Sequence, residues 1–252
     1  MKILLTNDDG IDSEGIQKLA SILRSRGKYK VTVLAPDQNR SGVSSALSIF
    51  MGQVKVLNLG EDNWSCSGTP VDCVISALLG SFCEKPDLVI SGINKGSNLG
   101  TDLLYSGTAA AARQASLFGI PALALSLHGK DPFNWDMAIS WAVDHLDEFL
   151  SYWKEYSFVN VNIPNSQEGP LGLIPSWPAL KNYNDSLSVK ETPDGLVCSL
   201  IGGVASVIND EGSDYEVISR GYASISTLYN LPVVRKDLCP GVPDYASAAG
   251  RR

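Results

Sequence analysis

The amino-acid sequence predicts an α/β protein built on a parallel β-sheet with helices packed against it. The chain opens with a short apolar run at residues 3–5, a helical pattern at residues 14–26 and a second apolar run at residues 31–35. This order is that of a βαβ unit, whose two strands lie parallel. Further apolar runs alternate with helical patterns up to about residue 165, so the same winding is expected to continue along the chain.

The first helix is indicated by the spacing of its apolar residues. Ile16, Leu19, Ala20 and Leu23 recur at helical intervals, and Gly27 follows the last turn. Such a stripe places one face of the helix against the sheet. The sequence therefore predicts a helix over residues 14–26.

A second helix, over residues 70–79, is indicated by its N-terminal residues. Thr69 is a typical N-cap, Pro70 fits the first helical position, and Asp72 completes a capping box. The preceding residues 47–59 have the composition of strands without a clear pattern.

The remaining elements of the first part are three strands and one long helix. Apolar runs predict the strands at residues 87–91, 121–127 and 158–163. An apolar stripe predicts a single helix over residues 134–153.

The pattern changes after residue 165. Prolines and polar residues become frequent, and strand-like runs stand at residues 196–201 and 222–228. We therefore expect a catalytic core over residues 1–165, and C-terminal hairpins and extended arms over residues 166–252 that pack on the core and on a partner subunit.

The first strand ends at two adjacent carboxylates, Asp8 and Asp9, followed by Gly10. Ligands of open α/β sheets collect beyond the carboxyl ends of the strands, so both aspartates are candidate metal ligands. Both can reach one cation only if the backbone turns here, and Gly10 allows such a turn at low cost. The alternative is that this segment is only a turn in which an aspartate bonds its own backbone.

Two more polar loops follow predicted strands. Residues 37–44 are rich in hydroxyl and amide groups, and residues 92–100 hold three glycines that let the backbone approach a ligand closely. Together with the aspartates, these loops offer carboxylate, hydroxyl and amide oxygens. Such a set suits magnesium, manganese or calcium better than zinc or copper.

A candidate phosphate site stands at Ser106, Gly107 and Thr108, which open an alanine-rich helix. Helix N-termini carry free N–H donors and a partial positive charge, and small residues let an anion come close. The alternative is an ordinary hydroxyl N-cap.

These groups together favour metal-assisted hydrolysis of a phosphate ester. A cation polarises the phosphoryl oxygen and lowers the pKa of a bound water, while helix N–H groups hold the developing charge. Either Asp8 or Asp9 could also act as the base for that water. No Ser-His-Asp set competes in the sequence, and neither His128 nor His145 receives a role.

Bulk properties narrow the class of protein further. The net charge of -7 would repel a phosphate backbone, which argues against nucleic-acid polymers as partners. No apolar run is long enough to span a membrane and the N-terminus is unlike a signal peptide, so we expect a cytoplasmic protein with no membrane partner. The five cysteines include no C-x-x-C pair and are expected to be reduced.

Several motifs of the first half occur in a specific combination. They are MKILLTNDDGI (residues 1–11), VLAPDQNRSGVSSALS (33–48), SGTPVDCV (67–74), PDLVISGINKGSNLGTDLLYSGTAAAAR (86–113) and GIPALALS (119–126). In order and spacing these blocks resemble the SurE (survival protein E) family of 5'/3'-nucleotidases.

The resemblance implies a Rossmann-like, three-layer fold and hydrolysis of nucleoside 5'- and 3'-monophosphates to nucleoside and phosphate through a metal-activated water. It implies one divalent cation per subunit, either magnesium or manganese, or calcium in a crystal. It also implies a homodimer or homotetramer with exchanged C-terminal arms, and cleavage of short polyphosphate by some members. By matching position, the metal ligands are Asp8, Asp9, Ser41 and Asn94, and the phosphate-binding residues are Asn94, Ser106, Gly107 and Thr108.

The second half resembles the family less, mainly through NVNIP at residues 160–164 and through residues 221–228. The family's arginine-rich segment leading to a tyrosine is reduced here to ALKNY at residues 179–183.

Two other functions stay open at this point. One is a broader phosphatase or exopolyphosphatase that uses the same site. The other is a nucleotide-binding sensor without turnover, against which the paired carboxylates count, because an anion sensor gains nothing from two negative charges unless a metal lies between them.

Overall fold

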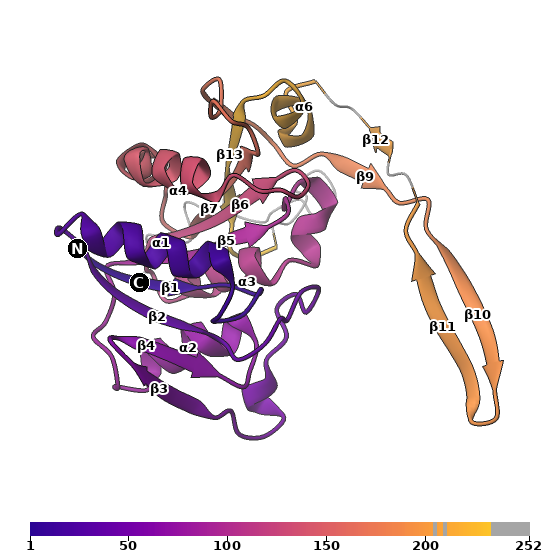
Figure 1. Cartoon of the computed structure of the whole chain (residues 1–252), viewed down its shortest axis with the longest axis horizontal. Helices are drawn as coiled ribbons and strands as arrows, with labels where there is room; N and C mark the ends of the chain where they lie inside the picture. Colours follow the sequence, from indigo (N-terminus) through magenta and orange to yellow (C-terminus); the bar gives the residue numbers. More distant parts are fainter. Residues whose placement is uncertain (204–205, 209–210, 233–252) are drawn as a thin grey trace, which may run out of the picture.

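A large sheet forms the centre of the protein in the computed structural model, which describes residues 1–203, 206–208 and 211–232 (Figure 1). Its strands are β1 (Lys2–Thr6), β2 (Lys30–Pro36), β3 (Val56–Gly60), β4 (Asn63–Cys66), β5 (Leu88–Lys95), β6 (Ala122–His128), β7 (Ser157–Pro164), β8 (Leu173–Pro175) and β13 (Ala223–Tyr229). They lie in the order β3-β4-β2-β1-β5-β6-β7-β13-β8. Among the described residues of this sheet, only the β3–β4 and β7–β13 pairs are antiparallel, so the predicted α/β class with a mostly parallel sheet is confirmed.

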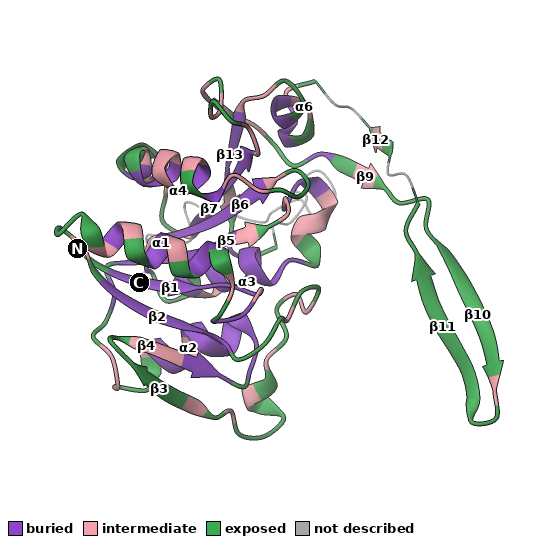
Figure 2. Ribbon diagram, viewed as in Figure 1, coloured by how far each residue is buried: buried purple, intermediate pink, exposed green. Residues whose placement is uncertain are grey.

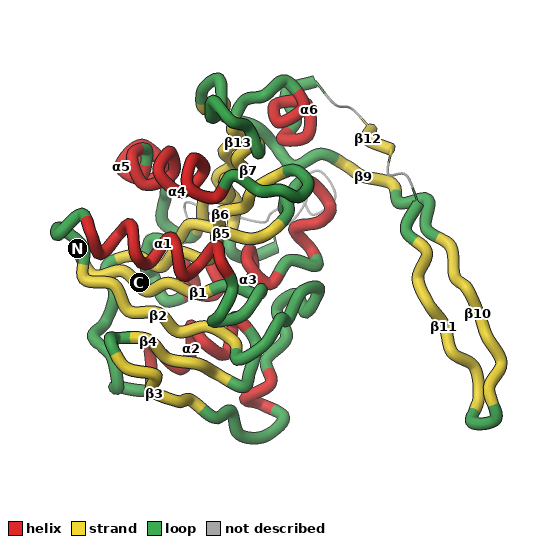
Figure 3. The backbone as a smooth tube through the Cα atoms, in the orientation of Figure 1, coloured by secondary structure: helices red, strands yellow, loops and turns green. Residues whose placement is uncertain are grey.

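Helices cover both faces of this sheet (Figure 3). One face carries α1 (Glu14–Ser25), α4 (Trp135–Asp144) and α5 (Leu146–Ser151), and the other carries α2 (Pro70–Leu79) and α3 (Gly107–Leu117). The strands supply both layers because successive side chains alternate. In β1, Ile3 and Leu5 pack in the first layer and Leu4 packs in the second.

The centre of the sheet is a switch point in the winding of the chain. After β1 the chain moves outward to β2, then returns to place β5 on the other side of β1. At such a point the loops beyond two neighbouring strands diverge to opposite faces and leave a crevice between them. The segments after β1 and at the end of β5 therefore border the same crevice.

The predicted helix over residues 134–153 is wrong as a single element, because the structure divides it at His145. α4 ends at Asp144 and α5 begins at Leu146. The His145 ring stacks on Trp141 with centroids 4.2 Å apart, and its Nδ1 lies 2.8 Å from the Trp141 carbonyl oxygen. The His145 side chain thus contacts a carbonyl of the last turn of α4 at the point where the helix is divided.

The other helices follow the predictions closely. α2 covers the expected residues, with Thr69 and Asp72 forming the capping box. α1 ends one residue before the expected bound. Before α2, residues 47–59 resolve into a short 3-10 helix, η1 (Ser48–Phe50), and the strand β3.

The second half of the chain contributes both to the sheet and to an arm. β13 pairs with β7 and β8, so the sheet continues past residue 165, with α6 (Asp214–Ser219) beside it. The arm begins with β9 (Leu180–Asn182), which pairs with β12 (Ser206–Ile208). It continues as a hairpin of β10 (Ser186–Thr192) and β11 (Gly195–Ile201) that projects from the body and is exposed along its length (Figure 2).

The cysteines in the described part of the chain, Cys66, Cys73, Cys83 and Cys198, are free thiols. Cys239 lies outside the described residues. Among the described residues, none of the helices combines the length and hydropathy needed to cross a membrane.

Candidate metal and phosphate site

The turn after β1 is built by Asn7, whose side chain is fully buried. Its amide nitrogen donates to the Gly10 carbonyl at 2.9 Å and to Ser13 Oγ at 2.7 Å, and its oxygen accepts the Gly10 N–H at 3.2 Å. Gly10 has φ +103, and a Cβ there would stand 3.1 Å from the Gln38 carbonyl carbon. Only glycine adopts this backbone without strain, so the chain can leave the strand sharply at this position.

Asp8 is almost completely buried, with 4% of its surface exposed. One oxygen, Oδ1, accepts the Thr108 hydroxyl at 2.5 Å. Burial raises the pKa of Asp8 to about 6, and the nearby Asp9 charge adds to the rise, whereas the Thr108 hydrogen bond opposes it. A cation at Oδ2 would offset the cost of keeping this carboxylate ionised.

Asp9 is half-buried and points into a different environment. Its Oδ2 accepts the backbone N–H of Lys95 at 2.9 Å. Burial raises the pKa of Asp9, and this N–H and the Lys95 charge lower it. The bond ties the turn after β1 to the end of β5, and Asp9 Oδ1 accepts no hydrogen bond from the described residues.

Asn94 is the second-last residue of β5. This strand runs to Lys95 rather than ending at the predicted residue 91. Its amide nitrogen donates to the Gly96 carbonyl at 2.9 Å, which directs the side-chain oxygen elsewhere. Ser41 is exposed, and its backbone N–H donates to Asn39 Oδ1 at 2.8 Å. Both residues line one cavity with Asp8.

The donor set fits a hard cation. Asp8 and Asp9 each use one carboxylate oxygen in a hydrogen bond and keep the second for another partner. Asn94 uses its amide nitrogen and keeps its single side-chain oxygen, and Ser41 supplies a hydroxyl. Oxygen ligands of this kind suit magnesium or manganese. Among the described residues no group of three or more His, Cys, Asp and Glu side chains is placed to hold a metal.

The N-terminus of α3 lies directly against Asp8. Ser106 is the N-cap, and its Oγ accepts the Ala109 N–H at 2.9 Å, which leaves its own O–H free to donate. A Cβ on Gly107 would stand 2.8 Å from the Asp8 Cβ, so only glycine allows this approach. The Thr108 hydroxyl binds Asp8 and thus holds the carboxylate rather than pointing to a ligand.

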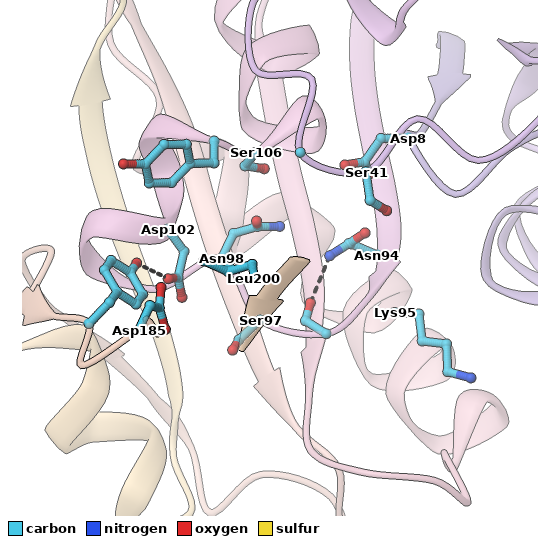
Figure 4. Close-up of a pocket in the computed structure, with 14 residues that line it drawn as sticks. Asp8, Ser41, Asn94, Lys95, Ser97, Asn98, Asp102, Ser106, Asp185 and Leu200 are labelled. Carbon is cyan, nitrogen blue, oxygen red and sulfur yellow. Dashed lines mark hydrogen bonds between the residues drawn. The ribbon is translucent and has the colours of Figure 1, made fainter. Parts of the chain in front are cut away.

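A cavity of about 590 Å³ extends from this point (Figure 4). Asp8, Ser41, Asn94 and Ser106 line it at one end, while Asp102 and Asp185 lie at the other. Tyr105 and Tyr183 line it too. Asp9 instead lines an adjoining cavity of about 300 Å³ with Ser13 and Lys95, and Gly107 and Thr108 line neither.

The opposite end of the larger cavity is not predicted from the sequence. Asp102 belongs to the 3-10 helix η2 (Gly100–Leu104), and Tyr183 and Asp185 follow β9. No local pattern joins segments so far apart in the chain. The only hint was the departure from the family's pattern at residues 179–183.

A buried network of amides supports the loop between β5 and α3. The Asn98 carbonyl accepts the side chains of Asn160 and Asn162, both at 3.1 Å, and the Asn98 side chain donates to Ser126 Oγ at 2.8 Å. The sequence NVNIP carried the signal, because two asparagines alternate there with apolar residues of a buried strand.

His128 lies beside this loop. Its Nδ1 is 3.1 Å from Ser97 Oγ, and its pKa is lowered, first by burial and then by the Lys181 charge. It is therefore mainly neutral at pH 7.

Comparisons with known proteins identify the family of this chain. A family model described as survival protein SurE matches residues 3–176. The 5'-nucleotidase SurE of Geobacter sulfurreducens is 39% identical over 237 residues, which are 91% of this chain and 88% of that protein. The corresponding protein of Haemophilus ducreyi is 37% identical over 239 residues, 91% of this chain and 94% of that protein.

A solved structure shares the fold. The crystal structure of the SurE protein from Aquifex aeolicus superposes with a TM-score of 0.81 at 32% sequence identity, covering 96% of this chain and 98% of that chain. Family model, sequence relatives and fold all agree over most of the length. The chain belongs to the SurE family.

Proposed function

We propose that this protein is a divalent-metal-dependent nucleotidase that hydrolyses nucleoside 5'-monophosphates, and also 3'-monophosphates, to nucleoside and phosphate. The observation that carries the proposal is that a group suited to bind a cation lies beside a group suited to bind an anion. Asp8 presents a buried carboxylate oxygen to a cation, and the N-terminus of α3 beside it presents N–H donors to an anion. The names of the sequence relatives, 5'-nucleotidase SurE, support the choice of substrate.

In this proposal Asp8, Asp9, Ser41 and Asn94 hold one magnesium or manganese ion. When bound, this cation supplies Lewis-acid polarisation of a phosphoryl oxygen and lowers the pKa of a coordinated water. The other steps belong to the chain itself.

The phosphate-binding residues are Asn94, Ser106, Gly107 and Thr108. The Ser106 hydroxyl and the free N–H groups of the first turn of α3 donate to the phosphate oxygens and stabilise the charge that develops on them. Thr108 acts by fixing the Asp8 carboxylate. Asp8 or Asp9 accepts the proton of the attacking water, and the leaving oxygen departs into the larger cavity.

The proposal extends to the setting of the enzyme. The enzyme works in the cytoplasm as a homodimer or homotetramer joined through the C-terminal arms. It also cleaves short polyphosphate as a side activity. The exposed hairpin of β10 and β11 supports an assembly of this kind.

A panel of nucleotides tests the proposed function. Phosphate release from 5'- and 3'-monophosphates is measured with magnesium, manganese, calcium or chelator. We expect turnover with a divalent cation and none with chelator. The Asp9→Asn variant should lose at least about 100-fold in kcat/KM, because it removes one of the two charged ligands.

A matched control is Asp12→Asn, which removes an exposed carboxylate three residues farther along the same segment. It should keep wild-type activity. Full metal-dependent activity in Asp9→Asn would contradict the assigned role, and nucleotide binding without phosphate release in any metal would favour the sensor instead.

A further inference from the structure

The end of the larger cavity opposite Asp8 is formed by the root of the arm. Tyr183 and Asp185 stand between β9 and β10 and line the cavity with Leu200 of β11. All three lie beyond residue 176, where the match to the family model ends. This end of the cavity therefore combines residues from the second half of the chain with Asp102 of η2.

Asp102 fixes the position of the Tyr183 ring. The Tyr183 hydroxyl donates to Asp102 Oδ1 (Figure 4), and the Lys181 ammonium pairs with Asp102 Oδ2. Only 9% of the Lys181 side chain is exposed, so the charge of Asp102 is balanced within the wall of the cavity. The tyrosine is thus held as a wall of the cavity, with 40% of its surface exposed.

Asp185 brings a second carboxyl group to this end of the cavity. One oxygen accepts the Gly203 N–H at 2.9 Å, and no ion pair with Asp185 occurs in the described part of the chain. Its charge acts on Tyr183, whose pKa is raised first by burial, then by the hydrogen bond to Asp102, and to a smaller extent by Asp185. An anionic group entering this end would meet the carboxylate without a compensating cation.

Lys95 is the only cationic side chain among the described residues that line the cavity. Its ammonium already pairs with Asp131 at 3.0 Å and lies 5.5 Å from the centre of the Phe133 ring. In Figure 4 its side chain extends away from Asp102 and Asp185. It therefore does not balance the charge of Asp185.

We propose that Tyr183 and Asp185 are specificity residues for the group esterified to the phosphate. They favour an uncharged leaving group with an aromatic ring, such as a nucleoside, and disfavour a leaving group that carries further phosphates, such as the pyrophosphate released from tripolyphosphate.

The reasoning rests on the proposed function, which places the reacting phosphoryl group beside Asp8 and Ser106. Every substrate then extends its leaving group along the same cavity toward the arm root. A nucleobase can stack on the exposed tyrosine ring, a contact that every base can make. A further phosphate approaches Asp185 instead and is repelled by it, with a strength reduced by solvent because Asp185 is exposed.

The first test compares AMP and tripolyphosphate as substrates of the wild type and of Asp185→Asn. Asparagine keeps an oxygen for the Gly203 N–H and removes the charge. We expect the KM for tripolyphosphate to fall about 3-fold, with the KM for AMP and both kcat values unchanged. The difference should shrink in 0.5 M salt, because ions screen exposed charges.

Asp194→Asn is the matched control. It makes the same change of charge at the turn between β10 and β11, outside the residues that line the cavity. It should leave both KM values as in the wild type. An equal fall in Asp194→Asn and Asp185→Asn would show a general effect of charge and overturn the proposal, as would an unchanged KM for tripolyphosphate in Asp185→Asn.

The second test concerns the ring. Tyr183→Leu should raise the KM for AMP about 5-fold without changing that for tripolyphosphate, because it removes the stacking surface. Tyr183→Phe keeps the ring and loses only the hydrogen bond to Asp102, so it should raise the KM for AMP less than Tyr183→Leu does. Equal KM values for AMP in wild type and Tyr183→Leu would overturn this part.

A failure of this proposal can be distinguished from a failure of the proposed function. If the wild type hydrolyses neither compound, the proposed function fails. The equilibrium dissociation constants of AMP and tripolyphosphate for the same variants then test the specificity residues directly, with the same expected direction and the same contradicting outcomes.

Discussion

The contact between Asp8 and Gly107 shows how closely the site depends on single atoms. The helix N-terminus reaches the carboxylate only because Gly107 has no side chain, and Thr108 then fixes the carboxylate through one hydrogen bond. The carboxylate has little room to adjust, because Asp8 is buried. Its position is therefore set by α3 as much as by its own strand.

A methyl group at Gly107 tests this dependence. In Gly107→Ala the new Cβ would lie 2.8 Å from the Asp8 Cβ, so helix and carboxylate must separate. We expect about a 100-fold loss in kcat/KM, because small displacements of reacting groups are costly. Circular dichroism should show a folded protein, since alanine suits a helix better than glycine.

The matched control is Gly52→Ala, where no atom lies within 4 Å of the added Cβ and the backbone is not left-handed. It should retain activity. Wild-type kinetics in Gly107→Ala would show that the helix and Asp8 can move apart without loss.

Among the helices and strands, the sequence predicts best those that are determined by signals within a few residues. The capping box of Thr69 and Asp72 acts within a few residues, and α2 follows it to the residue. The division between α4 and α5 at His145 is not predicted from the sequence. The ring contact between His145 and Trp141 does not alter the spacing of the apolar residues. Asn94 was found by resemblance, whereas Tyr183 and Asp102 meet across 81 positions and leave no local pattern.

Asp214 is the residue that joins three of these elements. It is fully buried at the start of α6 and accepts the Gly100 N–H of η2 at 2.7 Å and the Ala179 N–H before β9 at 2.9 Å. Each carboxylate oxygen thus serves one backbone donor. This side chain thus adds a buried link between the two walls that carry Asp102 and Tyr183, beside the direct bonds of Tyr183 and Lys181 to Asp102.

Asp214→Asn should therefore destabilise the protein and loosen the cavity. The amide has one oxygen for two buried donors, so one N–H loses its acceptor, at a cost of about 1–3 kcal/mol in the free energy of unfolding. We expect that loss in urea denaturation, together with a higher KM for AMP.

Asp144→Asn serves as its control, because Asp144 pairs with Arg26 in a surface ion pair whose loss should cost at most about 1 kcal/mol. If Asp214→Asn unfolds at the same urea concentration as the wild type, the residue does not join the two walls.

For the molecule as a whole, the outstanding feature is the hairpin of β10 and β11. The pairing places Leu187 opposite Leu200, Val189 opposite Cys198 and Glu191 opposite Leu196, so one face is mostly apolar. The other face carries mostly serine, lysine and threonine. A two-stranded hairpin exposed in this way is barely stable in water, which favours its burial against another subunit.

Charges on the apolar face should break the proposed assembly. The double variant Leu187→Asp, Leu196→Asp places two carboxylates where an apolar contact is expected, and sedimentation equilibrium should then give a smaller species than the wild type. Ser188→Asp with Thr192→Asp, on the opposite face, should keep the wild-type mass. An unchanged mass in the leucine variant would exclude this face as the contact.

The two ends of the cavity come from different parts of the chain, and this separation bears on how such an enzyme can diversify. The groups at the sheet edge are fixed by close packing of β1, β5 and α3, in which almost any replacement is costly. At the arm root the side chains of Asp185 and Leu200 are exposed, so substitutions at these two positions can accumulate at little cost in stability. Descendants of one ancestor could thus acquire new substrates by drift in the arm while inheriting the hydrolytic chemistry unaltered.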